Sequence, residues 1–501
     1  MGTMSTATSD WLKSSDSKDY FELLRFPTVG AEKEHLRDCV QCATWLKKWL
    51  KGIGAEAELI VPQIGRADCS QSAARGVGDN APYQVPVVFG EIKGQEGATT
   101  VLLYGHYDVQ PADPLEEWKT PPFEPTVKGD RVYCRGAQDD KGQVFAFLCG
   151  ERELVGGVVP NAPHGANGPL RTTGPTIKIV LDGQEESGSV GLFKLLEHKE
   201  FRKRLTADVM LVCDTSAAAD LRPAIVAGLR GVNHFTVTLR AANRDLHSGE
   251  YGGIAPNAAQ GMAELMASLH NADGSIAVSG FRDGIEPPTH EELAKAEESF
   301  SHCAGEDAPA PVADRIEAYY AKDIGTEPCG GQRGKTIVQR NCFEPTIEVN
   351  GIHSGYGGPG SKTVIPCEAI AKLSTRLVPG QCPAKAYEAV KRHLKDRCPK
   401  GMQVELSELT GDSPGFRLPL ASPLFRLAAD VLSEMDPRGA VFQWDGASIP
   451  VVASIREASG AAPLLVGWGQ PEDRIHSPNE SFSARQFEAA KTWAKKILSA
   501  F

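Results

Sequence analysis

The chain has 501 residues, 53 of them basic and 64 acidic, so its formal net charge is −11 at pH 7. With 41% hydrophobic and 23% charged residues, its composition is that of an ordinary globular protein with large cores. The acidic balance and the lack of clustered Lys and Arg residues argue against nucleic acid as a partner, because binding phosphates requires concentrated positive charge.

The N-terminal stretch has no apolar signal core, and no apolar run reaches the roughly 18 residues that cross a bilayer. We therefore expect a cytoplasmic protein with no membrane partner. Gly2 fits a loose myristoylation pattern that a start at Met4 would remove, so its lipidation stays open. The 12 cysteines are irregularly spaced, which favours reduced thiols over a disulfide framework.

The first predicted element is a helix over 32–51, followed by an irregular polar loop at 62–83. Short apolar runs then alternate with helical segments. We expect strands at 101–104, 177–181 and 209–212, and helices at 143–154 and 190–196. Runs that are apolar at consecutive positions are typical of strands buried on both faces of an α/β sheet.

A second pattern begins near Gly228, where apolar and polar residues alternate as in a half-exposed strand. A helix at 257–270, a Pro/Gly/Ala-rich irregular excursion at 303–334 and strands at 346–349 and 371–377 follow. This pattern favours a smaller α+β domain whose sheet is covered on one face.

Short apolar runs at 450–453 and 464–467, and a closing helix at 484–498, resume the first pattern. The predicted fold class is therefore α/β: a discontinuous domain with a central mixed sheet flanked by helices, carrying an inserted α+β domain.

Several predicted strands lead directly into histidine or carboxylate side chains. The pairs of strand and side chain are 101–104 with His106, 177–181 with Glu186, 209–213 with Asp214, and 464–467 with His476. Each residue alone would be an ordinary loop or surface residue. Because sites in open α/β sheets form outside the carboxyl ends of strands, the joint pattern predicts one shared crevice.

Asp139 adds a further carboxylate, in a glycine-flanked acidic turn that leads into a helix. These imidazoles and carboxylates are ligands of the kind that zinc or manganese accepts. Three carboxylates carry three negative charges, and two divalent ions carry four positive charges. A bridging hydroxide would cancel the one positive charge that remains. The charge balance therefore favours two ions.

Eight stretches in the chain match motifs of one enzyme family, in the family's order. They are YGHYDVQP (104–111), RGAQDDKGQ (135–143), LDGQEESGS (181–189), DLHSGEYGG (245–253), GSKTVIP (360–366), RLVP (376–379), GASIPV (446–451) and IHSPNE (475–480). Together they resemble the co-catalytic dinuclear metallopeptidases, which include aminoacylases, carboxypeptidases and cytosolic nonspecific (carnosine-type) dipeptidases. The dipeptidase branch is the most similar.

The resemblance implies that Asp139 bridges two metal ions. His106 and Asp214 would complete one metal site, and Glu186 and His476 the other. The ions would be zinc, with manganese or cobalt as alternatives.

The resemblance also assigns roles beside the metals. Asp108 would orient the imidazole of His106, and Glu185 would be the general base. The inserted domain, with expected boundaries 223–415, would be a lid and dimerisation domain, and the catalytic domain would comprise 1–222 and 416–501.

The lid would supply His247 and Arg376 to the substrate, with Thr363 nearby, while Ser448 would face the substrate from the catalytic domain. His247 would help to stabilise the oxyanion. One departure from the dipeptidase branch is that 410–415 lacks an expected histidine. Extra loops at 62–83 and 160–175 could reshape the entrance to the site.

We therefore predict a two-metal hydrolase, acting as a homodimer, that cleaves the amide bond of dipeptides with a free C-terminal carboxylate. The alternative within the same class is an N-acyl or N-carbamoyl amino acid hydrolase. A noncatalytic partner subunit is disfavoured because all ligands and Glu185 are present.

Overall fold

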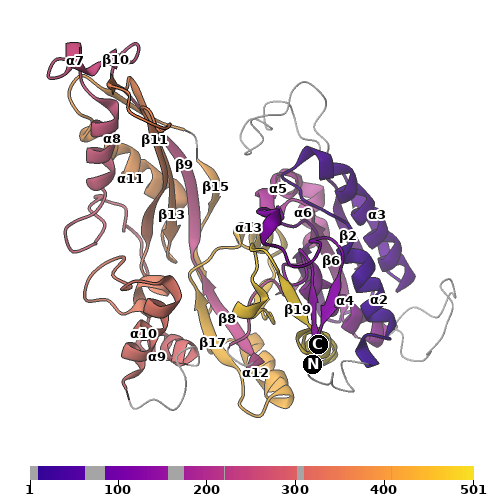
Figure 1. The fold of residues 1–501 in the computed structure, drawn as a ribbon. Helices are drawn as coiled ribbons and strands as arrows, with labels where there is room; N and C mark the ends of the chain where they lie inside the picture. The colour runs from indigo at the N-terminus through magenta and orange to yellow at the C-terminus, as the bar shows by residue number, and fades with distance from the viewer. Residues whose placement is uncertain (1–9, 63–84, 156–173, 219–220, 302–309, 408) are drawn as a thin grey trace. The chain divides into compact units, whose positions relative to one another are not determined.

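The computed structural model describes residues 10–62, 85–155, 174–218, 221–301, 310–407 and 409–501. Gly2 and nearly all of the loops at 62–83 and 160–175 lie outside these residues. The chain divides into two compact units (Figure 1). Unit 1 comprises Met1–Val226, Pro419–Phe442 and Ser454–Phe501, and unit 2 comprises Ala227–Leu418 and Gln443–Ala453. The boundaries at 222 and 415, and the lid role of the insert, stay predictions.

Unit 1 is built around a mixed sheet. Its strands are β1 (Glu56–Ile60), β2 (Val87–Ile92), β3 (Thr100–His106), β6 (Thr176–Asp182), β7 (Val209–Val212), β18 (Ala462–Leu465) and β8 (Ala224–Leu229), the last of which continues into unit 2. They lie in the order β1-β2-β6-β3-β7-β18-β8. Strands β6, β3, β7 and β18 are parallel, and the flanking pairs are antiparallel. The predicted α/β fold with a mixed sheet is confirmed.

Helices cover this sheet. The unit 1 helices are α2 (Ser15–Leu24), α3 (Leu36–Gly52), α4 (Lys141–Val155), α5 (Val190–Glu197), α6 (Lys199–Leu205), α12 (Pro423–Met435) and α14 (Ala484–Ala500). Helix α3 packs on β1 and β2, α4 on β3 and α12 on β18, while α14 lies along α4. In the centre of the sheet, the apolar run 101–104 of β3 is fully buried, as expected for a strand with both faces covered.

A small second sheet in unit 1 joins distant parts of the chain. Its strands are β4 (Thr126–Lys128), β5 (Arg131–Tyr133) and β19 (Ser481–Ser483), in the order β19-β5-β4. Strand β19 leads directly into α14, whose N-cap Ser483 accepts a hydrogen bond from the Gln486 backbone N–H.

Unit 2 has a separate antiparallel sheet in the order β11-β13-β9-β14, with β15 also paired to β9. Its strands are β9 (Gly231–Arg240), β11 (Thr346–Ser354), β13 (Glu368–Leu377), β14 (Gln403–Leu406) and β15 (Thr410–Ser413). Two short strands, β10 (Leu246–His247) and β12 (Val364–Ile365), pair separately. Strands β16 (Phe416–Arg417) and β17 (Val441–Asp445) both pair with β8 and so belong to the mixed sheet.

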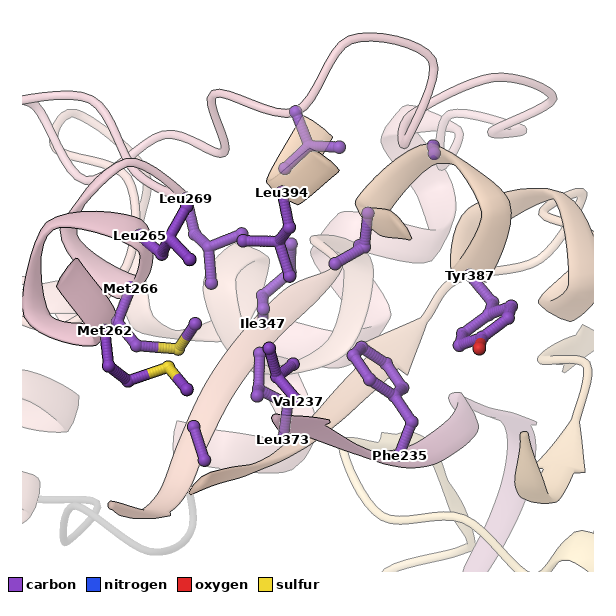
Figure 2. Packing of buried hydrophobic residues seen from close by; sticks show 14 of the residues in the cluster. Phe235, Val237, Met262, Leu265, Met266, Leu269, Ile347, Leu373, Tyr387 and Leu394 are labelled. Atoms are coloured by element: carbon purple, nitrogen blue, oxygen red, sulfur yellow. The ribbon is translucent and has the colours of Figure 1, made fainter. Parts of the chain in front are cut away.

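The unit 2 sheet packs against α8 (Ala258–Ala267) and α11 (Pro383–Asp396) through alternate side chains. The other unit 2 helices are α7 (Ser248–Tyr251), α9 (His290–Ser301), α10 (Val312–Ile324) and α13 (Pro450–Ser459), which continues into unit 1. Phe235, Val237 and Leu373 point into a core with Met262 and Leu265 of α8 (Figure 2). The intervening residues of β9 are more exposed, which agrees with a sheet covered on one face.

Two local expectations were wrong. The excursion at 303–334 contains α10, and the run at 450–453 opens α13 instead of forming a strand. The residues described contain no helix that is both long and apolar enough to cross a membrane.

Candidate metal centre

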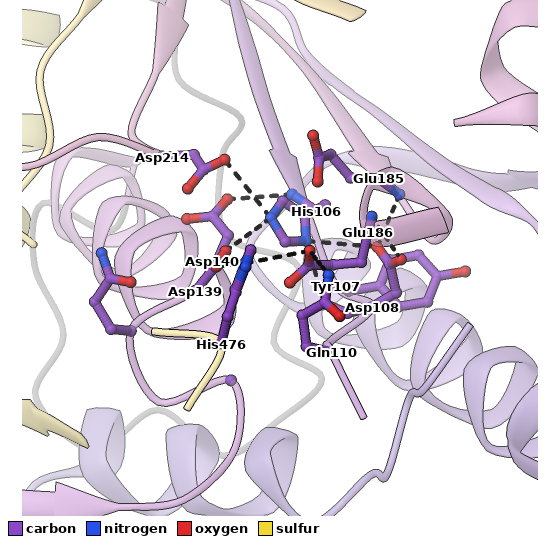
Figure 3. Close-up of polar contacts among 12 residues, drawn as sticks. His106, Tyr107, Asp108, Gln110, Asp139, Asp140, Glu185, Glu186, Asp214 and His476 are labelled. Atoms are coloured by element: carbon purple, nitrogen blue, oxygen red, sulfur yellow. Dashed lines mark hydrogen bonds and ion pairs between the residues drawn. The ribbon is translucent and has the colours of Figure 1, made fainter. Parts of the chain in front are cut away.

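The first group of potential metal ligands lies at the carboxyl ends of β3 and β7 (Figure 3). His106 is the last residue of β3 and is fully buried. Its Nε2 atom lies 3.1 Å from Asp139 Oδ1 and 3.7 Å from Asp214 Oδ2. This Nε2 is buried and makes no hydrogen bond. An imidazole nitrogen that faces two carboxylates without a hydrogen bond fits a metal ion as the missing partner.

The second group shares Asp139 with the first. Oδ2 of Asp139 lies 2.9 Å from His476 Nε2, which is also 3.4 Å from Glu186 Oε2. Within each group the ligand atoms all lie within 4.8 Å of one another. One carboxylate placed between two groups is the arrangement that a pair of bridged ions needs.

Asp108 is hydrogen-bonded to the segments that carry Glu186 and His106 and so fixes the orientation of these two ligands. Its Oδ1 accepts the backbone N–H of Glu185 at 3.0 Å, and its Oδ2 accepts that of Glu186 at 3.1 Å. Nδ1 of His106 lies 3.1 Å from the Asp108 carbonyl oxygen. An Nδ1–H that donates to this oxygen leaves the Nε2 lone pair for a metal. Burial raises the pKa of Asp108, and its hydrogen bond with His106 opposes that shift.

Glu185 belongs to neither ligand group, although it is adjacent to Glu186 in the chain. It begins a short 3-10 turn, Glu185–Ser187, just after β6. Burial raises the pKa of Glu185 well above its usual range; His106 opposes this shift and the negative charge of Asp214 adds to it. A carboxylate with increased proton affinity beside the ligands is suited to accepting a proton from a water molecule.

The carboxylates and imidazoles of the two ligand groups shift one another's pKa values. The carboxylates of Asp139 and Glu186 raise the pKa of His476 to about 10. Burial would raise the pKa of Asp139, but His106 and His476 outweigh it and lower the pKa below its usual range. The carboxylates thus favour positive charge at this centre. Divalent ions would supply that charge.

The other predicted site residues lie in unit 2, in two pairs. His247 is exposed on β10, and its Nε2 lies 3.5 Å from Thr363 Oγ1. Arg376 on β13 donates from Nη1 to Ser448 Oγ at 2.9 Å. Ser448 falls in the 443–453 part of unit 2. The structure therefore brings Arg376 and Ser448 together, and places His247 beside Thr363.

Two side chains near the metal centre were not predicted. Gln110 donates to Glu186 Oε2 at 2.7 Å, and Glu480 hydrogen-bonds to the backbone of Asp139. Both fall inside stretches that matched family motifs, 104–111 and 475–480. Their presence in those stretches was the available signal, but nothing in the sequence indicated which partner each would contact.

The sequence model described as "Peptidase family M20/M25/M40" matches residues 102–500. The chain belongs to this peptidase family. As an M20 peptidase, it is an enzyme of the metallopeptidase class, and the predicted family is confirmed.

Among curated relatives, the human Beta-Ala-His dipeptidase is 28% identical over 429 residues, covering 82% of this chain and 77% of the human protein. The Cys-Gly metallodipeptidase DUG1 of Candida albicans is 26% identical over 482 residues, covering 93% of this chain and 90% of the yeast protein. Among solved structures, the M20 family metallo-carboxypeptidase Sso-CP2 from Sulfolobus solfataricus has a TM-score of 0.78 and 25% identity, covering 97% of this chain and 98% of that one.

Proposed function

We propose that this M20 peptidase hydrolyses dipeptides that carry a free C-terminal carboxylate, at a centre of two divalent metal ions. The observation that carries the proposal is Asp139, whose two oxygens face His106 on one side and His476 on the other. The dipeptidase names of the human and Candida relatives support the substrate class.

The proposed chemistry divides between the ions and the chain. His106, Asp139 and Asp214 would hold one ion, and Glu186 and His476, with Asp139, the other. When bound, such ions polarise the scissile carbonyl and acidify a water molecule. The side chains then move the proton.

Glu185 accepts the proton of the attacking water and delivers it to the leaving amine nitrogen. Asp108 keeps this base in place through the Glu185 backbone N–H. Arg376 and Ser448, which are already hydrogen-bonded to each other, bind the substrate's carboxylate end. His247, with Thr363 nearby, stabilises the developing oxyanion.

We further propose zinc as the native metal, with manganese or cobalt as alternatives, because the ligands are imidazole and carboxylate groups that all three metals accept. A cytoplasmic location and a homodimer formed through the inserted 223–415 domain complete the proposal. The dimer is supported by β11, which lies at the edge of the unit 2 sheet with Val349 and Ile352 exposed.

The substrate class can be tested with matched compounds. The metal-free protein is reconstituted with zinc, manganese or cobalt. It is then assayed against dipeptides, their C-terminal amides, and N-acetyl and N-carbamoyl amino acids with the same C-terminal residue. We expect dipeptides to be cleaved fastest and the amides at least roughly tenfold more slowly, since removing a buried charge partner costs more than about 1.4 kcal/mol.

Faster cleavage of the N-acyl or N-carbamoyl compounds would make the chain an amino acid deacylase instead. The altered stretch at 410–415 is the feature that favours this second candidate. Glu185→Gln protein, prepared in parallel, shows how much of the measured activity comes from the proposed centre.

A further inference from the structure

Glu480 is a fully buried carboxylate whose two oxygens receive four hydrogen bonds. Oε1 accepts the backbone N–H groups of Gln138 and Asp139, at 2.9 and 3.1 Å. Oε2 accepts the Gly136 N–H at 2.9 Å and the Arg135 guanidinium at 2.8 Å. The carboxylate therefore sits inside the turn that presents Asp139 to both ligand groups.

Arg135 extends this network to another ligand segment. It is almost fully buried, and its second terminal nitrogen donates to the Pro111 carbonyl oxygen at 3.0 Å. Pro111 lies on the segment that follows His106. The guanidinium also stacks over the Trp118 ring, 5.4 Å from its centroid. One ion pair thus contacts the segments of His106 and Asp139, while Glu480 itself belongs to the segment of His476.

The His476 segment needs such an anchor. Arg474, His476 and Asn479 all have positive φ angles, of 58°, 56° and 67°. This left-handed conformation is unfavourable for residues other than glycine and persists only where surrounding contacts hold it. The antiparallel pairing of Ser481 with Tyr133 secures the end of the loop, and Glu480 is the residue immediately before that pairing.

We propose that the Glu480–Arg135 pair is a positioning element that sets the geometry of both metal-ligand groups at once. The pair contacts neither the side chains of the proposed metal ligands nor the substrate. It acts by fixing the backbone of the segments that carry Asp139 and His476. Buried ion pairs contribute little net stability but can select one arrangement of the chain. This inference rests on the two-ion centre of the proposed function.

The substitution Glu480→Gln tests the pair with little change in shape. An amide offers one acceptor oxygen and an NH₂ group, so in either orientation two of the four donors lose their acceptor. Because Asp139 belongs to both ligand groups, we expect both ions to bind roughly 10- to 100-fold more weakly, the usual effect of removing a partner behind the ligands. Titration calorimetry with zinc measures both affinities without any substrate.

Asp473→Asn is the matched control. Asp473 is also fully buried and lies in the same loop, but its carboxylate contacts Gln470, Gln486 and Arg131 and not the Asp139 turn. We expect this variant to leave the affinity of the His106–Asp139–Asp214 group within about twofold of the wild type. Equal weakening of both ions in the two variants would mean general damage to the loop and would overturn the proposal.

Visible absorption of the cobalt-loaded protein separates positioning from simple loss of stability. At saturating cobalt, a variant that is only less stable has the wild-type spectrum, whereas displaced ligands change the band positions and intensities. We expect Glu480→Gln to show an altered spectrum, and an unaltered spectrum with wild-type affinities would refute the role.

If Glu480→Gln does not fold, Arg135→Lys provides the test. A lysine keeps the positive charge, but it lacks the forked guanidinium that donates to Glu480 and to the Pro111 carbonyl at the same time. We expect both ions to bind roughly 3- to 10-fold more weakly, and unchanged binding would again overturn the proposal. A wild-type protein that binds two ions but cleaves no dipeptide would instead refute only the proposed function.

Discussion

Glu185 and Glu186 are neighbours in the chain, yet their carboxylates have different surroundings. Oε2 of Glu186 lies 3.4 Å from Nε2 of His476 and accepts a hydrogen bond from Gln110. Glu185, in contrast, is in neither ligand group. We expect Glu185→Gln to keep its metal but to lose roughly 10²- to 10⁴-fold in turnover, the usual share of acid–base catalysis. Metal analysis and kcat measured on the same sample check this.

The matched variant is Glu186→Gln, which should lose metal from the His476 group. If Glu185→Gln were instead metal-free, with near-normal turnover once metal is resupplied, the two roles would have to be exchanged.

Asp139 is the residue on which the two-ion interpretation depends. Because it belongs to both groups, Asp139→Asn is expected to abolish binding of both ions, whereas Asp214→Asn should affect one. Elemental analysis after brief desalting should give about two divalent ions per wild-type chain, about one for Asp214→Asn and close to none for Asp139→Asn. A wild-type ratio of one under saturating metal would contradict the proposal.

At the scale of single elements, β11 is the edge strand of the unit 2 sheet: among the residues described, it pairs with β13 on one side and with no strand on the other. Ile352 on this strand is 54% exposed, and Val349 is 39% exposed. If two chains pair through this edge, Ile352→Asp should weaken the dimer at least roughly tenfold, because the interface would bury an unpaired charge. Sedimentation velocity over a range of concentrations measures the effect.

Ile254→Asp is the control for that experiment. Ile254 is 78% exposed in unit 2 and lies outside any strand. A dimer that survives Ile352→Asp, or that is disrupted equally by Ile254→Asp, would place the interface elsewhere.

The sequence predicted best those elements whose pattern of apolar residues follows from burial alone. The run 101–104 had to be a central strand because it is apolar at every position, and it lies in β3. Helix α10 was missed because the Pro, Gly and Ala residues of 303–334 were taken to mark an irregular segment, although Val312, Ile316 and Tyr320 recur at helical spacing within it. At 450–453, Val451 and Val452 suggested a strand, whereas Pro450 opens α13, a first-turn position that proline favours.

The sequence predicted which side chains come together in the candidate metal centre, but not which residues hold them in place. His106 and Asp214 follow buried strands, so the rule for parallel sheets placed them at one edge. The contacts of Glu480 with the Asp139 turn join residues more than 340 positions apart. No local pattern encodes such a pairing, because contacts between distant segments, including the β5–β19 ladder, bring the two together.

At the scale of the whole molecule, the placement of His247 outside unit 1 allows a test of subunit cooperation. We expect His247 to act on the partner subunit's metal centre. Two inactive variants, Glu185→Gln and His247→Ala, are mixed under conditions in which subunits exchange. In a mixed dimer one centre has both residues and the other has neither.

At equal mixing about half of the dimers are mixed, so activity should rise toward about a quarter of the wild-type value. His247→Ala should also retain its metal, because His247 is in neither ligand group. No recovery of activity despite demonstrated exchange would show that His247 acts within its own chain or not at all.

The position of β18 between β7 and β8 has a consequence for how the protein is made. A ribosome completes all of unit 2, which ends at Ala453, before Ala462 of β18 emerges. Until then the nascent sheet of unit 1 lacks an inner strand, and the facing edges of β7 and β8 are open to wrong partners. A premature stop before β18 therefore removes the middle of a sheet, and we expect aggregation of such chains during synthesis, measurable as their loss from the supernatant in cell-free translation.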